Sequence, residues 1–358
     1  MEKMNKLFFL LPALLVLNCK PQQVNQVAME MKPVVKVFAT LETVPVSSAD
    51  DAADDACIWI NPTDVMNSTI IGTNKQEGLV VYNLNGEQLF SYPVGRVNNV
   101  DIRSGFTFKN EKVSVVTASN RTYNTITVHI VNPVTGALID VASRPIKSHL
   151  KEVYGLTMYK SKITQKLYVF ICGKDGGVEQ WELFENNNYI DAKLVRNLVL
   201  STQTEGMVTD DFYGKLYVAE EDKALWKFEA EPNKTNEKIK IVSVKNSNMK
   251  DDFEGVTIYD SGEGKGYVIL SSQGNNSYAV FDRITNQYIG SFLIGNGKID
   301  GTNDTDGIDV TSISFGDKFP KGFFIAQDGA NTQGKDTLHQ NFKIVDWKSI
   351  ADKLQLSE

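Results

Sequence analysis

Histidine and cysteine, the residues of many nucleophilic and metal-dependent active sites, are rare in this sequence. Only three of its 358 residues are His and three are Cys. His129, His149 and His339 do not have the spacing of a metal site, so we interpret them as structural or surface residues. Cys57 and Cys172 each lie within an apolar strand-like segment, which favours buried free thiols over a disulfide. The pattern therefore does not indicate catalysis that depends on His or Cys.

The sequence also lacks an excess of positive charge and a long hydrophobic run. Its 37 Lys and Arg residues and 44 Asp and Glu residues give a net charge of −7, which argues against nucleic acid as the main partner. The N-terminal apolar run, residues 7–17, is too short for a typical transmembrane helix. It follows Lys3 and Lys6, as in a secretory signal peptide. We therefore expect an exported protein.

The end of this N-terminal segment resembles a bacterial lipobox. Residues 15–19 read Leu-Val-Leu-Asn-Cys, which makes Cys19 a candidate for lipidation. Asn18 departs from the small residue that usually precedes the cysteine, so secretion without a lipid is the alternative. We interpret residues 1–19 as a signal peptide of the lipoprotein type and residues 20–33 as a tether. The protein is then an outer-membrane or cell-surface lipoprotein, held to the membrane only by its lipid, or a secreted protein.

No long stretch has the 3.6-residue period of a helix. Short apolar segments instead alternate with turns rich in Gly, Asn and Asp, which predicts an all-β fold. Four later segments share one pattern, with aromatic residues about 50 positions apart. They are Lys166-Leu-Tyr-Val-Phe-Ile, Lys215-Leu-Tyr-Val-Ala, Lys265-Gly-Tyr-Val-Ile-Leu and Lys321-Gly-Phe-Phe-Ile-Ala. Each is followed by a polar turn and a second apolar segment.

Two earlier pairs of segments fit the same pattern. They are Thr69-Ile-Ile-Gly with Leu79-Val-Val-Tyr, and Val113-Ser-Val-Val with Thr125-Ile-Thr-Val. Six repeats of this length are typical of a propeller whose blades are small antiparallel sheets. We therefore predict a six-bladed β-propeller of four-stranded antiparallel blades, formed by residues 34–358 as a single domain. Residues 34–44 form an additional predicted strand, placed to complete the last blade and close the ring.

A residue followed by Gly recurs at the start of the first strand in four predicted blades, and in three of them it is acidic. Tyr154, Glu205, Glu254 and Asp306 share this register at spacings of about 50 residues. Because the first strand of each blade lines the central channel, we expect these positions to converge on one ring. Further carboxylates flank it in the pattern, namely Asp54, Asp55, Asp101 and Asp252. So many carboxylates cannot all remain ionised without cations.

The acidic run at residues 300–309 adds hard oxygen ligands on a loop that contains Gly. It reads Asp-Gly-Thr-Asn-Asp-Thr-Asp-Gly-Ile-Asp, and such ligands are those that Ca²⁺ prefers. The run is not an EF-hand, because Thr305 stands at the position that requires Gly. A solvated acidic loop is the alternative interpretation.

The residues near the ends of the second strands predict that one half of this face of the ring is basic and the other half acidic. Because the first and second strands of a blade are antiparallel, the second ends where the first begins. The first three repeats supply basic residues there, namely Lys75, Arg121 and Lys174. The last three supply Glu205, Glu221, Glu254, Asp306 and Asp328. One half could hold anionic oxygens and the other calcium, which predicts a small polyanionic ligand that also binds metal.

A series of short motifs between residues 54 and 347 contains most of these residues. It includes Asp54-Asp-Ala-Cys-Ile-Trp, Thr73-Asn-Lys, Asn98-Asn-Val-Asp-Ile-Arg, Ala118-Ser-Asn-Arg, Glu152-Val-Tyr-Gly, Gln203-Thr-Glu-Gly-Met, Ala219-Glu-Glu-Asp-Lys-Ala-Leu-Trp, Asp252-Phe-Glu-Gly, Ser271-Ser-Gln-Gly-Asn, Asp304-Thr-Asp-Gly-Ile-Asp and Gln327-Asp-Gly. Together they resemble the β-propeller phytases, calcium-dependent phosphatases of myo-inositol hexakisphosphate (phytate). Two positions depart from that family's pattern, because Gln76 replaces a second Lys and Asp175 replaces Glu. Both departures concern substrate affinity.

The resemblance implies a 3-phytase-type phosphoric monoester hydrolase with several Ca²⁺ ions as cofactors. It implies calcium ligands at Asp54, Asp55, Val100, Glu205, Asp252, Glu254, Gln273, Asp300, Asp306 and Asp328. It implies catalytic roles for Lys75, Arg121, Tyr154, Lys174 and Glu221, and substrate contacts from Lys75, Arg121, Tyr154, Lys174 and Asp175. A calcium-activated water would attack phosphorus directly, the substrate would be phytate or calcium-phytate, and the protein would be a monomer.

Two other functions remain open from the residues alone. A non-catalytic propeller scaffold would need exposed aromatic residues around the open face, where these loops instead supply charge. A calcium-dependent lactonase or esterase on the same fold would need one metal and a general base rather than three basic residues. Phosphate release from phytate with and without calcium would distinguish these functions.

Overall fold

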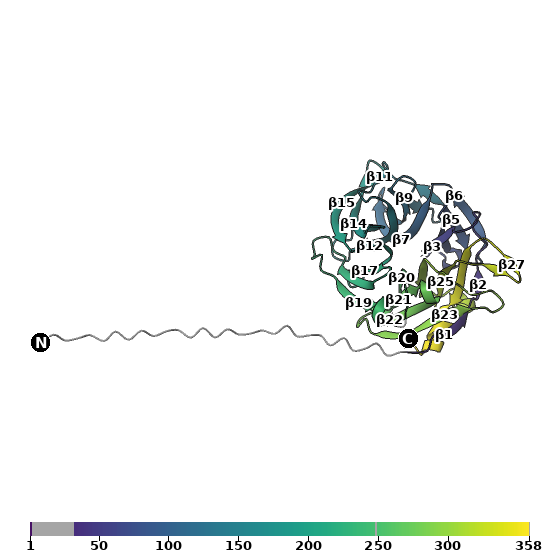
Figure 1. The fold of residues 1–358 in the computed structure, drawn as a ribbon. Helices are drawn as coiled ribbons and strands as arrows, with labels where there is room; N and C mark the ends of the chain where they lie inside the picture. Colours follow the sequence, from purple (N-terminus) through teal and green to yellow (C-terminus); the bar gives the residue numbers. More distant parts are fainter. Residues whose placement is uncertain (2–31, 248, 358) are drawn as a thin grey trace.

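The repeats form six antiparallel sheets arranged as blades around a central axis, as the ring in Figure 1 shows. The computed structural model describes residue 1, residues 32–247 and residues 249–357. The six-bladed β-propeller predicted from the repeats is confirmed. The predicted signal peptide, Cys19 and most of the tether lie outside the described residues and stay predictions. In the described part of the chain, no helix is long and apolar enough to cross a membrane.

Each blade is built from strands that pair with their neighbours in the sheet. Blade one contains β3 (Ala53–Trp59), β4 (Thr69–Asn74), β5 (Gly78–Asn83) and β6 (Gln88–Tyr92). Blade two contains β7 (Val97–Phe108), β8 (Glu111–Asn120), β9 (Thr125–Val131), β10 (Leu138–Asp140) and β11 (Ile146–Lys147). Blade three contains β12 (Val153–Lys160), β13 (Leu167–Gly173), β14 (Gly177–Asn186) and β15 (Tyr189–Val199).

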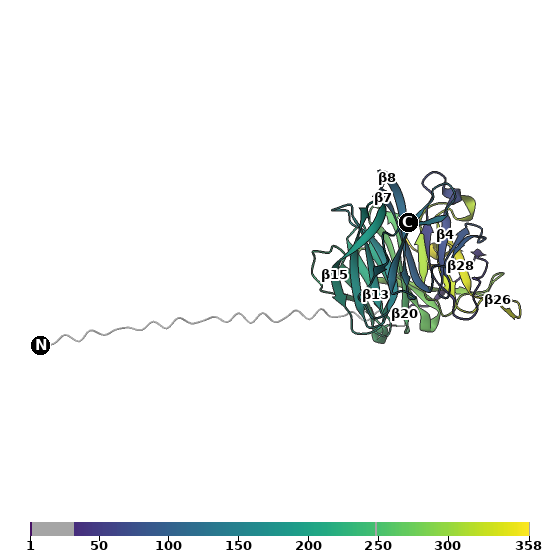
Figure 2. The ribbon, with the colours of Figure 1, turned by 90° about the horizontal axis from the view of Figure 1, so that it is seen from above.

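The second half of the ring repeats this arrangement. Blade four contains β16 (Thr204–Asp210), β17 (Lys215–Glu220), β18 (Ala224–Glu229) and β19 (Ile239–Ser243). Blade five contains β20 (Phe253–Gly262), β21 (Lys265–Ser272), β22 (Ser277–Asp282) and β23 (Tyr288–Gly295). Blade six contains β24 (Ile308–Thr311), β25 (Phe323–Asp328) and β28 (Asn341–Asp346). The hairpin of β26 (Thr332–Gln333) and β27 (Asp336–Thr337) projects from the edge of the ring (Figures 1 and 2).

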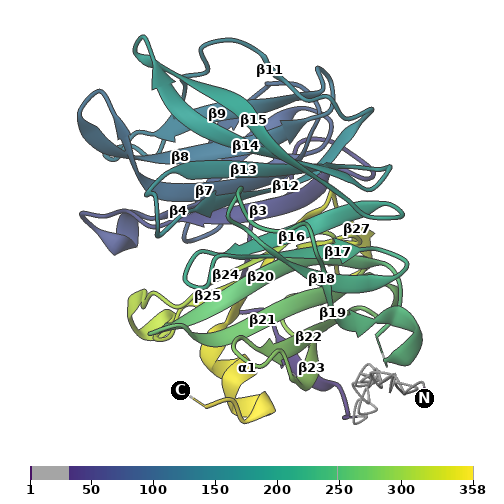
Figure 3. The ribbon, with the colours of Figure 1, turned by 90° about the vertical axis from the view of Figure 1, so that its left-hand side faces the viewer.

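Short helices complete the chain. They are the 3₁₀ helices η1 (Val65–Asn67), η2 (Val244–Asn246), η3 (Gln273–Asn275) and η4 (Gly316–Lys318), and the α-helix α1 (Trp347–Leu354). Apolar side chains from successive blades pack against each other, because alternate residues of a strand point to opposite faces of its sheet. Helix α1 lies at the outside of blades five and six (Figure 3), where Trp347 and Ile350 pack with Val37 and Phe292.

The N-terminal segment closes the ring at two places. Strand β2 (Leu41–Glu42) pairs antiparallel with β28 and is the fourth strand of blade six. Strand β1 (Val35–Phe38) pairs in parallel with β23 of blade five. The prediction that residues 34–44 complete the last blade is thus right for β2. The sequence pattern did not indicate that β1 crosses to blade five, because an isolated apolar segment does not specify which sheet edge it joins.

A buried lysine fixes this closure. The Lys343 ammonium on β28 lies 2.6 Å from the Glu42 Oε2 atom of β2, 2.9 Å from Asn331 Oδ1 and 3.4 Å from Asp328 Oδ2, and it also contacts Asp300. The Lys343 side chain is fully buried. Its positive charge therefore holds together three carboxylates, of which Asp328 is fully buried, that would otherwise repel each other.

We expect Lys343→Met to destabilise the fold strongly, because it leaves the buried Asp328 and the mostly buried Asp300 without their cation. Breaking a buried ion pair in this way costs about 3–5 kcal/mol. Urea denaturation in the presence of a calcium chelator measures the loss. The control is Lys166→Met, because Lys166 pairs with Glu182 at 2.8 Å but its side chain is half exposed. Equal loss in both variants would show that Lys343 is not what holds the closure.

Candidate metal and phosphate site

The acidic residues at the start of the inner strands are brought together by the glycines that follow them. A Cβ atom on Gly206 would lie 2.0 Å from the carbonyl oxygen of Glu254, and one on Gly255 would lie 2.6 Å from that of Asp306. The Gly255 N–H donates to the Asp306 carbonyl at 2.8 Å. Only Gly permits backbones to approach this closely. The strands of successive blades therefore place Glu205, Glu254 and Asp306 at one end of the ring, which we call the site face.

Three buried glutamates form the centre of the site face. Carboxylate oxygens of Glu205, Glu221 and Glu254 lie within 4.8 Å of one another. Glu221 Oε1 and Glu254 Oε2 are buried and have no hydrogen-bond partner among the described residues. Hard oxygen atoms that are clustered, buried and unpartnered fit a divalent cation such as Ca²⁺.

Burial is the main cause of the unusual titration of these carboxyl groups. It raises the pKa of Glu205 to about 8 and that of Glu221 to about 7, and it also raises the pKa of Glu254. The negative charges of neighbouring carboxylates add to the effect. Without a cation, the groups favour their protonated forms near neutral pH.

A cavity of about 360 Å³ opens beside Glu221 and Glu254 and is lined by seven of the predicted site residues. Its lining includes Lys75, Tyr154, Glu221, Asp252, Glu254, Gln273 and Asp306, all of which were predicted. It also includes Asp51 and Gln203, which sequence reasoning missed as site residues. Gln203 Nε2 donates to Glu221 Oε2 at 2.9 Å, and Gln273 Nε2 donates to Asp306 Oδ1 at 2.7 Å. Amide side chains therefore orient two of the carboxylates.

Lys75 lies among the carboxylates rather than apart from them. Its ammonium is 2.6 Å from Asp51 Oδ1, 2.9 Å from Asp54 Oδ1 and 2.7 Å from Asp306 Oδ2. Burial still raises the pKa of Asp54 and of Asp306 to about 7 each. The predicted division of the face into a basic and an acidic half therefore does not extend to Lys75. Strand spacing gave the position of this residue but not the direction of its side chain.

The other two basic residues flank Tyr154. The Lys174 ammonium lies 4.5 Å from the centre of the Tyr154 ring, and the Arg121 guanidinium lies 5.4 Å from it. Arg121 Nη2 also donates to Glu152 Oε1 at 2.8 Å. Burial and the nearby carboxylates raise the pKa of Tyr154 above its ordinary value. The hydroxyl therefore remains a hydrogen-bond donor beside two cations, an arrangement that suits an anionic oxygen.

Asn98 connects the basic and acidic groups. Its Nδ2 donates to Asp54 Oδ2 at 2.9 Å and to Glu205 Oε1 at 2.6 Å, and its Oδ1 accepts from Arg121 Nη1 at 3.1 Å. The residue is fully buried. Asn98 was not among the predicted site residues. The signal available was its place at the head of the segment Asn98-Asn-Val-Asp-Ile-Arg, three residues before an inner-strand acid.

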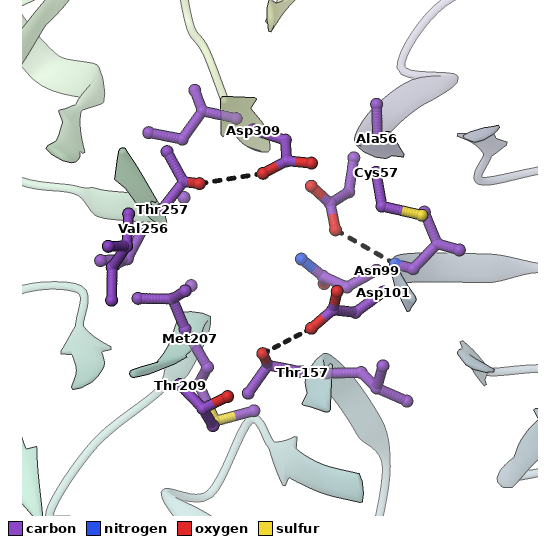
Figure 4. Close-up of a pocket in the computed structure, with 18 of the residues that line it drawn as sticks. Ala56, Cys57, Asn99, Asp101, Thr157, Met207, Thr209, Val256, Thr257 and Asp309 are labelled. Carbon is purple, nitrogen blue, oxygen red and sulfur yellow. Dashed lines mark hydrogen bonds between the residues drawn. The ribbon is translucent and has the colours of Figure 1, made fainter. Parts of the chain in front are cut away.

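Asp55 and Val100 line a separate cavity of about 230 Å³ in the central channel. The Val100 N–H donates to Asp55 Oδ2 at 3.1 Å. Figure 4 shows Asp101 and Asp309 in the same cavity, where Thr157 donates to Asp101 and Thr257 donates to Asp309. Burial raises the pKa of Asp309 to about 7. The predicted ligands Asp55 and Val100 are thus neighbours of each other within the channel.

Three predicted residues lie away from the glutamates. Asp300 and Asp328 surround the Lys343 ammonium, which lies where the sequence predicts a cation. Asp175 Oδ1 accepts from the Gly177 N–H at 3.2 Å within its own turn. An acidic run does not reveal which of its carboxylates a distant lysine will neutralise. Calcium binding by Asp300 and Asp328, and a substrate contact from Asp175, stay predictions.

The raised carboxyl pKa values predict that the metal-free protein loses stability as pH rises. The unfolded carboxyl groups titrate near about pH 4, whereas Asp54, Glu205, Glu221 and Asp306 titrate at about 7 to 8 in the fold. The folded state therefore holds protons that the unfolded state has lost, and this stabilisation disappears between about pH 4 and pH 8.

Thermal unfolding with a chelator at about pH 5 and about pH 8 measures this loss. We expect a lower Tm at the higher pH, and a smaller difference in Glu205→Gln, which removes one titrating group. A Tm that is equal or higher at the higher pH would contradict the prediction.

Comparison with known proteins identifies the family of the chain. A family model described as Phytase matches residues 6–358. The chain is similar to a 3-phytase of Bacillus subtilis (strain 168), with 46% identity over 326 residues, which is 89% of this chain and 85% of that protein. A solved structure of a Bacteroides thetaiotaomicron protein of unknown function is similar with a TM-score of 0.53, over 87% of this chain and 75% of that one. At 11% identity, that likeness shows the fold alone. The family match and the identity to the Bacillus protein show that the chain belongs to the phytase family.

Proposed function

We propose that the protein is a calcium-dependent phosphomonoesterase that hydrolyses phytate to lower inositol phosphates and phosphate. The observation that carries this proposal is that unpartnered buried carboxylates and Tyr154 line one cavity, and that the Lys174 and Arg121 cations lie over the ring of the same Tyr154. A polyanion that also binds metal is complementary to the cations beside Tyr154 and, through the metal, to the carboxylates. The membership of the phytase family and the 3-phytase named among the relatives support this substrate. Export through residues 1–19, with Cys19 lipidated, is part of the proposal.

The residues that would hold calcium are the clustered glutamates, together with Asp54, Asp252, Gln273 and Asp306. Their oxygen donors and their net negative charge fit this hard cation. Calcium bound there would supply a nucleophile at neutral pH and positive charge for the phosphoryl oxygens. Glu221, which was predicted as a catalytic residue, lies within this cluster and would act together with the ligands.

The residues that would hold phosphate are Arg121, Lys174 and Tyr154. Arg121 presents a planar fork that can donate two parallel hydrogen bonds to a phosphoryl group. Lys174 contributes a point charge, and the protonated Tyr154 hydroxyl donates a further hydrogen bond. In the reaction, water oxygen forms a bond to phosphorus, the bond from phosphorus to the inositol oxygen breaks, and that oxygen takes up a proton. Positioning and charge neutralisation are the main contributions that proteins make to such a step.

Phosphate release from phytate tests the proposal directly. We expect activity with calcium, its loss after exhaustive chelation together with a fall in Tm, and its return when calcium is added back. Glu205→Gln should lower kcat even at saturating phytate, because Glu205 lies in the metal cluster. The control is Glu263→Gln, whose side chain is 89% exposed in a turn between β20 and β21. Full activity after chelation would reject the calcium dependence, and no phosphate release under any condition would reject the substrate.

Lys174→Ala should lower kcat/KM by about ten- to a hundredfold, since losing a charged hydrogen-bond partner costs about 1.5–3 kcal/mol. Most of this loss should appear in KM, because Lys174 would bind phosphate in the ground state as well as in the transition state. Lys238→Ala is the matched control, as Lys238 packs over the Trp226 ring at 4.3 Å on blade four. Steady-state kinetics at fixed calcium would contradict the assignment if Lys174→Ala were neutral or if the control lost as much.

A further inference from the structure

The contacts of Lys75 concern both of the proposed functions of the site, calcium binding and phosphate binding. It directly follows β4, and its ammonium lies within 3 Å of oxygen atoms on Asp51, Asp54 and Asp306. Two of these residues, Asp54 and Asp306, belong to the proposed calcium ligands. Lys75 itself was predicted to bind phosphate. The same side chain therefore stands between the carboxylates and the anion that it is expected to hold.

Because Lys75 has one positive charge, binding the carboxylates and binding a phosphate compete with each other. A lysine ammonium has three N–H donors and no acceptor. In the structure, Lys75 Nζ donates a hydrogen bond to Asp306 Oδ2 at 2.7 Å and forms ion pairs with Asp51 Oδ1 at 2.6 Å and Asp54 Oδ1 at 2.9 Å. The side chain is only 12% exposed. In this arrangement the charge of Lys75 is compensated by three carboxylates rather than by a phosphoryl oxygen.

We propose that Lys75 is an internal cation that competes with calcium for Asp54 and Asp306, and that calcium binding releases Lys75 to the phosphate. The inference rests on the proposed function, because it assumes calcium at these carboxylates. When calcium neutralises these two carboxylates, the ammonium loses two of its three partners and keeps only Asp51, so its charge becomes available to a phosphate. Coupling between two binding sites is reciprocal. An anion that captures the released Lys75 must therefore strengthen calcium binding by the same factor.

This competition predicts that substitution of Lys75 affects calcium binding and anion binding in opposite directions. Removing a phosphate ligand should weaken anion binding, but removing a competitor should strengthen calcium binding. We expect Lys75→Met to bind calcium about ten- to a hundredfold more tightly than the unmodified protein, since calcium no longer has to displace charged hydrogen bonds. We expect the same variant to lose the enhancement of calcium binding by an anion. Lys75→Arg keeps the cation and should bind calcium with nearly unchanged affinity.

Lys174→Met is the matched control for charge. It removes one positive charge from the same face, but no described carboxylate lies within ion-pair distance of Lys174. Its calcium affinity should therefore change by much less than that of Lys75→Met, because charges that are not in contact are screened by salt.

Calorimetric titration of calcium into the chelator-treated full chain tests the proposal. The titrations are run with and without sulfate, a tetrahedral dianion that serves as the phosphate probe. Tighter calcium binding by Lys75→Met, and sulfate enhancement in the unmodified protein but not in Lys75→Met, are the expected results. Unchanged or weaker calcium binding by a folded Lys75→Met variant would overturn the inference. If that variant does not fold, absence of sulfate enhancement in the unmodified protein would overturn it instead.

The outcomes also separate this inference from the proposed function. Calcium binding and phytate hydrolysis by the unmodified protein, together with unchanged calcium affinity in Lys75→Met, would reject the inference alone. Absence of calcium binding by the unmodified protein would reject both.

Discussion

The structure depends on the close approach of the inner strands at the centre of the ring. Gly206 and Gly255 allow the backbones of successive blades to come within hydrogen-bonding distance. The acidic residue that precedes each glycine is then carried into a small, desolvated volume. Like charges in such a volume cannot all remain ionised unless cations neutralise them. The ion pairs and the candidate metal ligands of the site face both follow from this concentration of negative charge.

The protein neutralises its clustered carboxylates with a different basic residue at each of three places. At the ring closure, Lys343 holds Glu42, Asp300 and Asp328. In the channel, Arg103 pairs with Asp101 and Asp211. At the site face, Lys75 holds Asp51, Asp54 and Asp306. The cluster of Glu205, Glu221 and Glu254 differs, since no lysine or arginine of the described chain forms an ion pair with it. Because no basic side chain pairs with these three glutamates, their negative charge is the charge that a bound cation would neutralise most effectively.

The repeats and the glycine that follows each inner-strand acid made the fold and the centre of the site predictable from sequence. A period of about 50 residues fixes the number of blades, and antiparallel pairing fixes which strand ends share a face. Contacts that depend on side-chain direction were not predictable. The position of Lys75 was right, but its three carboxylate partners come from two sequence regions that no spacing rule connects to it. Lys343 lies in the regular strand β28, and nothing in that strand's alternation indicates that its ammonium meets Glu42 of β2.

The acidic run at residues 300–309 shows how the fold and the site depend on each other. One end of the run is held by Lys343 through Asp300, and its middle is held by blade six, because Asp328 accepts from the Asn303 N–H and Thr305 donates to the Gln327 carbonyl. The Asp306 N–H in turn donates to Gln327 Oε1 at 2.9 Å. The run is therefore a braced connection between β23 and β24 that presents Asp304 and Asp306 to the cavity of the site face. Because the same lysine closes the ring and anchors this connection, the geometry around Asp306 depends on the closure of the propeller.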